Sequence, residues 1–374
     1  MSLPRRASTR MPLRERFLAA VAGDASAPPV LAPDLSYWLQ AHPLPGSADV
    51  SGTADFHRRL GVLPYYVYGS ALSYLAFPDS PAHTVEEGDG RWATIWETPL
   101  GPLRKETTRL PASVTEAITA YPVQNPDDLR RLIAMYAGAR VVPLPVDAYR
   151  ERDRLLASYD GYALLAVPRS PVPALMVDWA GVMNGVVLLA DAPELCREFF
   201  AVVARLCLQA VDILCAAAPP LIHVCDNLTS DVYTPYYAEH MAPHYRAVLE
   251  RLHGAGSRVA THLDGTVRGL LPLLAETGFD VVEALTPQPV GDASAAEMRA
   301  LAGPTTVLWG GLPGAMFAPP WTWEQFRAHV LEVLAAWRGT PFILGIADQL
   351  PPDGDIEFVR RTAALLESET GGRS

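Results

Sequence analysis

The stretch Val259-Ala260-Thr261-His262-Leu263-Asp264-Gly265 decides the fold, because a short β-branched run ends there in residues able to bind a metal or move a proton. A second run, 280–284, ends in the same way, with Glu283 placed 21 residues after His262. Two further runs end on Asp226 and Asp348. Strands of a parallel β/α barrel end at one rim, where active sites are built. These four endings therefore predict an α/β fold of the (β/α)8 TIM-barrel class.

Eight short apolar runs along the chain are predicted to be strands, and helical patterns separate them. Strands that alternate with helices of this length form parallel βαβ units. The predicted strands are residues 29–32, 63–68, 162–167, 221–225, 258–261, 280–283, 305–309 and 342–346. The predicted helices are residues 193–218, 237–254, 323–337 and 356–366.

The segment from about 78 to 145 breaks this alternation, with several prolines and the tryptophans Trp92 and Trp96. We interpret it as an insertion after the second strand, forming a small β-hairpin and a helix that cap the barrel mouth. A linker between two domains is the alternative interpretation. Because α/β barrels of this length are commonly one domain, we expect residues 1–374 to form a single domain.

The composition argues against several classes of partner. The formal net charge is −11, whereas phosphate contacts need clustered lysines and arginines. The most apolar segments are too short or too interrupted to predict a membrane span, and the basic N-terminus lacks the apolar core of a signal peptide. We therefore expect a cytoplasmic protein that binds neither nucleic acid nor membrane.

His262 and Glu283 form the centre of the predicted site. Adjacent strands lie about 5 Å apart, so the imidazole and the carboxylate are expected to converge. They can share a divalent metal, or form a pair that tunes a general base, and the residues leave both open. Asp264 and Asp348 complete a predicted metal set with an open position. Zinc is favoured, although a set without thiolate also suits Mg or Mn.

Asp226 and Asn227 form a second candidate feature, a polar pair just past a buried strand. We expect them to act on a substrate, and a turn that caps the next helix is the alternative. Cys225 is expected to face the barrel wall, because neighbours on a strand face opposite ways. Further pocket residues are expected after the first and third strands: Tyr37, Trp38, Trp179 and Asn184.

In order and spacing, these motifs resemble the uroporphyrinogen decarboxylase superfamily, and more closely its corrinoid-dependent methyltransferase-like branch. The resemblance covers most of the chain. Residues 14–21 and 29–33 resemble the opening helix and strand, and 96–101 the inserted segment. Three later motifs are similar to the strand-four motif, the histidine loop and the late glycine pair: Cys225-Asp226-Asn227-Leu228, His262-Leu263-Asp264-Gly265 and Trp309-Gly310-Gly311.

Two departures from the family narrow the chemistry that the resemblance implies. Uroporphyrinogen decarboxylases carry an arginine-rich motif after the first strand that binds the porphyrinogen carboxylates, whereas residues 34–40 contain no arginine. Thiol-methylating members bind zinc through a His-x-Cys pair and a later cysteine. Here Asp264 stands at the first cysteine, and Asp348 stands near the second. These departures argue against activation of a thiol and leave open an oxygen-ligated zinc that acts as a Lewis acid.

The function implied by the resemblance is transfer of a methyl group from a small methoxylated or N-methylated substrate to the cobalt of a corrinoid. His262, Glu283 and Asp226 are the expected catalytic residues, and Asn227 helps to orient the substrate. A partner protein is expected to carry the corrinoid, since the sequence lacks an Asp-x-His-x-x-Gly segment. A homodimer is implied by the resemblance alone.

Two other functions stay open. One is a decarboxylase or lyase of the same fold that acts on a small carboxylate, with His262 and Asp226 as acid and base and no metal. The other is a barrel without catalysis that serves as a binding subunit of a corrinoid system. The mutation His262→Ala separates them, because a binding subunit keeps its partner affinity while an enzyme loses turnover.

Overall fold

A sheet of six parallel strands forms the centre of the molecule in the computed structural model, which describes residues 11–44, 49–65, 71–111 and 115–371. The spatial order of the strands follows the chain, so that each strand pairs with the one that precedes or follows it in sequence. They are β7 (Leu165–Val167), β8 (Leu221–Leu228), β9 (Arg258–Leu263), β10 (Val281–Leu285), β11 (Val307–Pro313) and β12 (Phe342–Ala347). The prediction of an α/β fold with a parallel sheet is confirmed.

The predicted first two strands are extended segments that join both edges of this sheet. Two backbone hydrogen bonds hold the first segment to β12, Ala32 N to Leu344 O (2.8 Å) and Leu344 N to Val30 O (3.0 Å). The second segment is held by Leu63 N to Leu31 O (2.9 Å) and Tyr162 N to Pro64 O (2.9 Å). Part of the second predicted strand, residues 66–68, lies outside the described residues. These contacts favour closure of the sheet into an eight-stranded barrel, which stays a prediction.

A separate cluster of buried side chains supports this arrangement, because it draws on all eight predicted strands and on α1 (Leu13–Val21). Among its members are Phe17, Val30, Leu63, Tyr162, Leu221, Ala260, Val281, Val307 and Ile343. Side chains two positions apart on a strand share a face. His223, His262 and Glu283 therefore follow Leu221, Ala260 and Val281 on the same face, one layer closer to the carboxyl ends of the strands.

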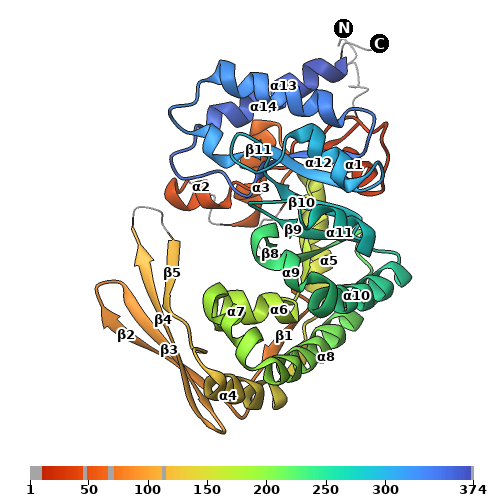
Figure 1. Cartoon of the computed structure of the whole chain (residues 1–374). Coiled ribbons are helices and arrows are strands. Elements are labelled where there is room, and N and C mark those ends of the chain that lie inside the picture. Colours follow the sequence, from red (N-terminus) through yellow and green to blue (C-terminus); the bar gives the residue numbers. More distant parts are fainter. Residues whose placement is uncertain (1–10, 45–48, 66–70, 112–114, 372–374) are drawn as a thin grey trace.

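Helices connect successive strands and pack on the sheet (Figure 1). Two predicted helices are confirmed almost to the residue, α8 (Pro193–Ala217) and α13 (Trp323–Trp337). A capping box between Thr322 and Gln325 fixes the start of α13. The others are α2 (Ser36–Ala41), α3 (Val50–Leu60), α5 (Val146–Ser158), α6 (Pro171–Pro173), α7 (Gly181–Asp191), α9 (Ser230–Tyr236), α10 (Ala242–Gly254), α11 (Leu271–Thr277), α12 (Ala295–Ala302) and α14 (Ile356–Gly371), with π-helical turns at Ala174–Trp179 and Tyr237–Met241 and a 3-10 turn at Gly314–Phe317.

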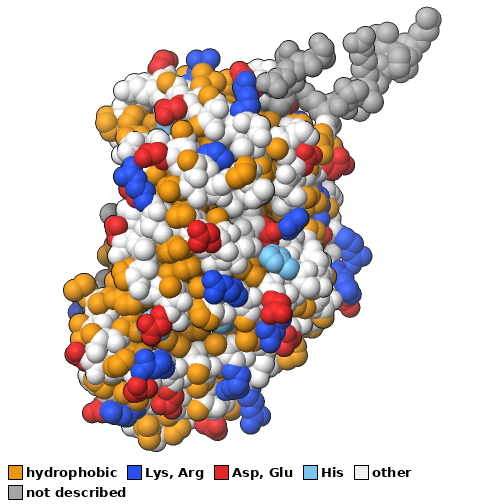
Figure 2. Space-filling model, turned by 45° about the vertical axis from the view of Figure 1, so that its right-hand side comes forward, with side chains coloured by type: hydrophobic (Ala, Val, Ile, Leu, Met, Phe, Trp, Pro, Cys, Tyr) orange, Lys and Arg blue, Asp and Glu red, His pale blue; other side chains and the backbone are white. Residues whose placement is uncertain are grey.

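Helix α8 has the length and apolar composition that a membrane span needs, and it alone does so among the helices searched in the described residues. Nine of its residues, including Phe199 and Leu214, are buried in the structure, and the helix packs against α4 (Pro126–Ala137) and α10. Its apolar character therefore serves the core of this fold. On the molecular surface, acidic and basic side chains are interspersed over the face shown in Figure 2.

The segment from about 78 to 145, which breaks the alternation of strands and helices, forms a four-stranded antiparallel sheet. A single hairpin was expected there. The first turn of the sheet is Asp89-Gly90, whose φ angles of 52° and 69° suit the tight two-residue turn of a hairpin. This sheet stands beside the parallel sheet (Figure 1), and whether it caps the mouth stays a prediction. The strands are β2 (Ala82–Gly88), β3 (Arg91–Thr98), β4 (Gly101–Leu110) and β5 (Thr115–Ala120), while β1 (Ser73–Ala76) pairs with β6 (Arg140–Pro143).

Candidate functional site

His262 lies at the centre of a polar cluster near the carboxyl ends of the strands. The members of this cluster are His223, His262, Asp264, Glu283 and Asp348. His262 stands directly opposite Glu283, because β9 and β10 pair in that register. Its Nδ1 atom lies 2.6 Å from Oε2 of Glu283. Its other nitrogen, Nε2, is buried and has no hydrogen-bond partner among the residues that the structure describes. The expectation that the imidazole and the carboxylate meet is thus met by the structure.

The unpartnered nitrogen of His262 faces two carboxylates. Its Nε2 atom lies 3.6 Å from Oδ2 of Asp264 and 3.7 Å from Oδ1 of Asp348. Two atoms that bind one tetrahedral zinc at about 2.0–2.2 Å are roughly 3.3–3.6 Å apart. Each carboxylate oxygen therefore lies at a distance from Nε2 of His262 that is close to the separation of two ligands of one divalent cation. All four residues of the predicted metal set are together at one place.

Glu283 has a different position in this arrangement. Its oxygen is close enough to Nδ1 of His262 for a hydrogen bond, and closer than two ligands of one metal usually are. A carboxylate that accepts the proton of one imidazole nitrogen fixes the ring orientation, and the other nitrogen can then exchange its proton for a metal. Glu283 therefore positions His262, and His262, Asp264 and Asp348 are the better candidates for ligands.

His223 on β8 extends the cluster by one strand. Its Nε2 atom lies 3.3 Å from the same oxygen of Glu283, and its Nδ1 atom lies 2.7 Å from Sγ of Cys225. Ligand atoms of His223, His262 and Glu283 all lie within 4.8 Å of one another, so this trio is an alternative metal set. The short contact between His262 and Glu283 makes a hydrogen-bonded network the better description of the trio.

The buried charges in the cluster stabilise one another. Burial raises the pKa of Glu283, but the imidazoles of His262 and His223 bring it down to about 2. Burial lowers the pKa of His262, whereas Glu283, Asp264 and Asp348 raise it well above its ordinary value. The cluster thus carries an excess of negative charge that favours a cation.

Asp34 adds an acid that the predicted site set did not include. It is buried just after the first predicted strand. Burial raises its pKa to about 7, although hydrogen bonds from Ser36 lower it, and the charges of Asp348 and Glu283 add to the rise. Asp34 can therefore hold a proton near neutral pH. The sequence signal that could have identified Asp34 is its position directly after a predicted strand, which it shares with the other site residues.

A cavity of about 720 Å³ lies beside the cluster. Asp264, Asp348 and Tyr37 line it, and Tyr37 is one of the pocket residues named from the sequence. Asp353 adds a third carboxylate, and none of the described residues that line the cavity is a lysine or an arginine. A substrate with several carboxylates would therefore find no basic side chain in this lining.

Asp226 does not join the cluster. It is completely buried, and its two oxygens accept hydrogen bonds from the backbone of Ser170 (2.9 Å) and from the hydroxyl of Tyr245 (2.7 Å). The expectation that Cys225 faces the wall is wrong, because its sulfur contacts His223. Strand alternation explains both results, since residues 223 and 225 share one face and residue 226 takes the other.

Four further predicted pocket residues are absent from the lining of the cavity. The indoles of Trp38 and Trp179 are buried and donate to Gly354 O and Tyr136 Oη, both at 3.0 Å. Large aromatic side chains pack in the core when their N–H finds a partner there. The other two are Asn227, exposed and bonded to Arg169, and Asn184, half-buried on α7.

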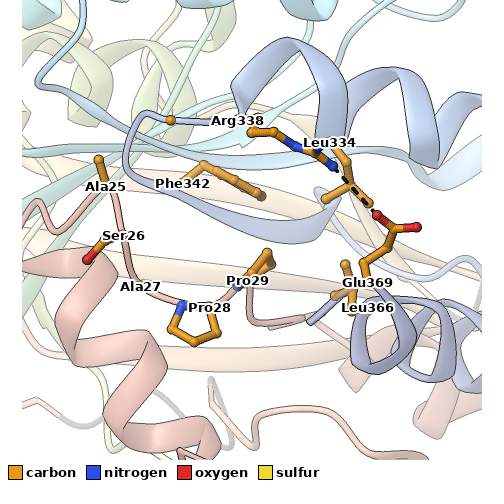
Figure 3. Close-up of a pocket in the computed structure, with 11 residues that line it drawn as sticks. Ala25, Ser26, Ala27, Pro28, Pro29, Leu334, Arg338, Phe342, Leu366 and Glu369 are labelled. Atoms are coloured by element: carbon orange, nitrogen blue, oxygen red, sulfur yellow. Dashed lines mark ion pairs between the residues drawn. The ribbon is translucent and has the colours of Figure 1, made fainter. Parts of the chain in front are cut away.

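A second pocket, of about 400 Å³, contains none of the cluster residues (Figure 3). Its lining includes Pro29 and Phe342, which stand at the starts of the first and last strands. An ion pair between Arg338 and Glu369 (3.6 Å) borders it. Because sites in this fold are built at the carboxyl ends of the strands, this pocket at their starts is not the candidate site.

The sequence of residues 151–368, more than half of the chain, matches the uroporphyrinogen decarboxylase (URO-D) family. This range runs from before β7 into α14 and contains the whole cluster, whereas Asp34 precedes it. No curated protein matches the chain.

Two solved structures share the fold over nearly their full length. A methyltransferase from Methanosarcina mazei is 14% identical, with 96% of this chain and 100% of that chain covered and a TM-score of 0.60. A B12-independent methionine synthase from Shewanella sp. W3-18-1, in complex with selenomethionine, is 11% identical, with 92% and 99% covered and a TM-score of 0.53. At these identities the likeness shows the fold alone.

Proposed function

The chain belongs to the uroporphyrinogen decarboxylase family, and on that premise we propose that it is a methyltransferase component. It moves a methyl group from a small methoxylated or N-methylated donor to the cobalt of a corrinoid on a separate protein. Two structural neighbours that are titled methyltransferase and methionine synthase support methyl transfer as the class of reaction. A cytoplasmic location and a homodimer belong to the same proposal.

The observation that carries the proposal is the buried, unpartnered Nε2 atom of His262 between Asp264 and Asp348. An orphaned imidazole nitrogen beside two carboxylates fits a divalent metal, and zinc suits this nitrogen and oxygen set. Bound zinc would supply a Lewis acid that makes the oxygen or nitrogen of the donor a better leaving group. Since the set holds no thiolate, Mg and Mn stay candidates.

Other residues of the chain position the histidine and line the cavity. Glu283 accepts the Nδ1 proton of His262 and so keeps the ring in place. Tyr37 lines the cavity and gives the donor an aromatic wall. Asp34 is buried, and burial raises its pKa to about 7, with the charges of Asp348 and Glu283 adding to the rise.

The alternatives have less support. A decarboxylase acting on a carboxylate would need a cation to hold its substrate, and the described lining of the cavity offers none. It would also use Asp226 as a base, although both oxygens of Asp226 already accept hydrogen bonds. A binding subunit would have no use for a buried imidazole nitrogen left without a partner.

The test is methyl transfer to free cob(I)alamin, followed by the absorbance change as methyl-cobalt forms. Zinc-loaded protein is mixed with one methoxylated aromatic or one N-methyl amine at a time. We expect donor-dependent methylation that falls at least about 100-fold in His262→Ala, because removing a metal ligand removes activation of the leaving group. His83→Ala, which alters an exposed histidine on β2, is the matched control. Equal rates in His262→Ala and wild type, or release of CO₂ from a carboxylate, would overturn the proposal.

A further inference from the structure

The loop that follows β9 carries one of the proposed metal ligands. Asp264 is the first residue beyond the strand, and Oδ2 of its carboxylate lies 3.6 Å from Nε2 of His262. The chain turns directly afterwards at Gly265, whose φ angle of 61° is in the left-handed region. A side chain ligates a metal well only when the surrounding structure holds it in place. The position of this loop therefore decides how close the carboxylate comes to the imidazole.

A threonine that follows the neighbouring strand β8 binds this loop. The hydroxyl of Thr229 lies 3.0 Å from the hydroxyl of Thr266. The same oxygen accepts a hydrogen bond from the backbone N–H of Thr266 (3.3 Å). It also lies close to Gly265, where an added Cβ would stand 3.1 Å from Oγ1 of Thr229. Thr229 thus contacts both residues that follow Asp264.

The hydroxyl of Thr229 is not used by its own helix. Thr229 occupies the N-cap position of α9, where a threonine hydroxyl usually accepts a hydrogen bond from an N–H group of the first turn. In the described structure of α9 the side chain makes no such bond. The hydroxyl therefore serves the loop that carries Asp264.

The far part of the loop is held without Thr229. The hydroxyl of Ser230 accepts hydrogen bonds from the backbone N–H groups of Gly269 (3.1 Å) and Leu270 (2.9 Å). The carboxylate of Asp292 accepts bonds from two more N–H groups of the loop, at 2.9 and 3.3 Å. These bonds do not involve the hydroxyl of Thr229. Its removal is therefore expected to release the first residues of the loop while the fold is kept.

We propose that Thr229 is a positioning residue of the metal site and acts through Asp264. Its hydroxyl holds the start of the loop, so that the carboxylate stays beside Nε2 of His262. This inference rests on the proposed function, since it concerns the metal set named there, and it adds a residue that binds no metal itself. Removing a group that orients a metal ligand commonly weakens metal binding about 10–100-fold.

The test measures zinc affinity in the full-length protein by competition with a chromophoric chelator. Thr229→Val keeps the branched shape of the side chain and removes its hydroxyl. We expect this variant to bind zinc about tenfold more weakly than the wild type. Thr229→Ser restores the hydroxyl and should bind zinc within about threefold of the wild type. Wild-type affinity in folded Thr229→Val would overturn the proposal.

Thr277→Val is the matched control for the loss of a threonine hydroxyl. Thr277 is half-buried like Thr229, and its hydroxyl also makes two hydrogen bonds, to Leu273 O and from Tyr237 Oη, both at 2.7 Å. It stands at the end of α11, outside the polar cluster. We expect both valine variants to melt at a lower temperature and only Thr229→Val to lose zinc affinity. An equal loss of zinc affinity in Thr277→Val would mean general destabilisation and would contradict the proposal.

A double-mutant cycle shows whether Thr229 acts through Asp264. Once the carboxylate is removed in Asp264→Ala, adding Thr229→Val should change zinc affinity by less than about twofold, because the two residues belong to one network. A further loss of about tenfold in the double variant would overturn the proposed route.

A second variant keeps the inference testable if Thr229→Val does not fold. Thr266→Val removes the partner hydroxyl, and the same loss of about tenfold is expected. Unchanged zinc affinity in folded Thr266→Val would count against the proposal. A wild type that binds no zinc would overturn this inference together with the proposed function, whereas every other contrary result leaves the proposed function standing.

Discussion

The hydrogen bond from His262 to Glu283 determines which imidazole nitrogen is available for a metal. Nδ1 lies 2.6 Å from the carboxylate and donates to it, and so Nε2 is the nitrogen that faces Asp264 and Asp348 and that a metal would bind in place of its proton. Carboxylates in this position orient a ligating histidine and raise its basicity. Glu283 thus acts on the proposed metal through His262.

The mutation Glu283→Gln tests this position. We expect zinc affinity to fall about 10–100-fold, because an amide neither fixes the ring as firmly nor raises its basicity. Competition with a chromophoric chelator measures the dissociation constant. Glu276→Gln, on the exposed face of α11, is the control and should bind zinc as the wild type does. Unchanged affinity in Glu283→Gln would contradict the role of Glu283.

At the scale of residues, the sequence predicts four members of the cluster and misses His223. His262, Glu283, Asp264 and Asp348 follow strand endings, and that pattern is local. His223 was missed because the polar ending of β8 was assigned to Asp226, which faces the opposite way. Counting alternate residues from Leu221 would have found it.

Among the elements, helix α3 contains a histidine that is buried in the uncharged state. His57 is 2% exposed, and its Nδ1 lies 2.8 Å from the carbonyl oxygen of Thr53. Burial lowers its pKa from 6.5 to about 4. The unfolded chain therefore binds a proton between these values, while the folded chain does not. The stability that neutral His57 contributes is complete above pH 6.5 and is lost as the pH falls to about 4.

We expect the free energy of unfolding to fall by about 2.5 kcal/mol between pH 7.5 and pH 4.5 because of His57 alone. Urea unfolding at the two pH values measures it, with His57→Gln as a variant that cannot titrate. The wild type should lose about 2.5 kcal/mol more than the variant over this range. Equal losses in the two proteins would show that His57 does not resist protonation.

Elements were predictable where their signals are local. The helix at 323–337 was predicted, and in the structure it has local signals: Thr322 caps its start, and apolar residues are buried along it. The four-stranded sheet was underestimated, because its first turn at Asp89-Gly90 was not weighed as a hairpin signal. Turn chemistry, more than hydrophobicity, defines this sheet.

At the scale of the whole molecule, the pairing of the first and last strands depends on contacts between residues far apart in the sequence. The first predicted strand reaches the last through backbone bonds between Ala32 and Leu344, 312 positions apart. No short window of sequence contains that information. The alternation of strands and helices nevertheless indicates it, because parallel βαβ units curl in one direction. That curl brings the carboxyl ends of β9, β10 and β12, and with them the metal set, to one place.

The stoichiometry of zinc tests the central claim most directly. Protein stripped with a chelator is reloaded with zinc, dialysed and measured by elemental analysis. The account predicts about one zinc per wild-type chain, less than about a tenth of that in His262→Ala, and a wild-type content in His83→Ala. Absence of zinc in the wild type, or an equal content in His262→Ala, would contradict it.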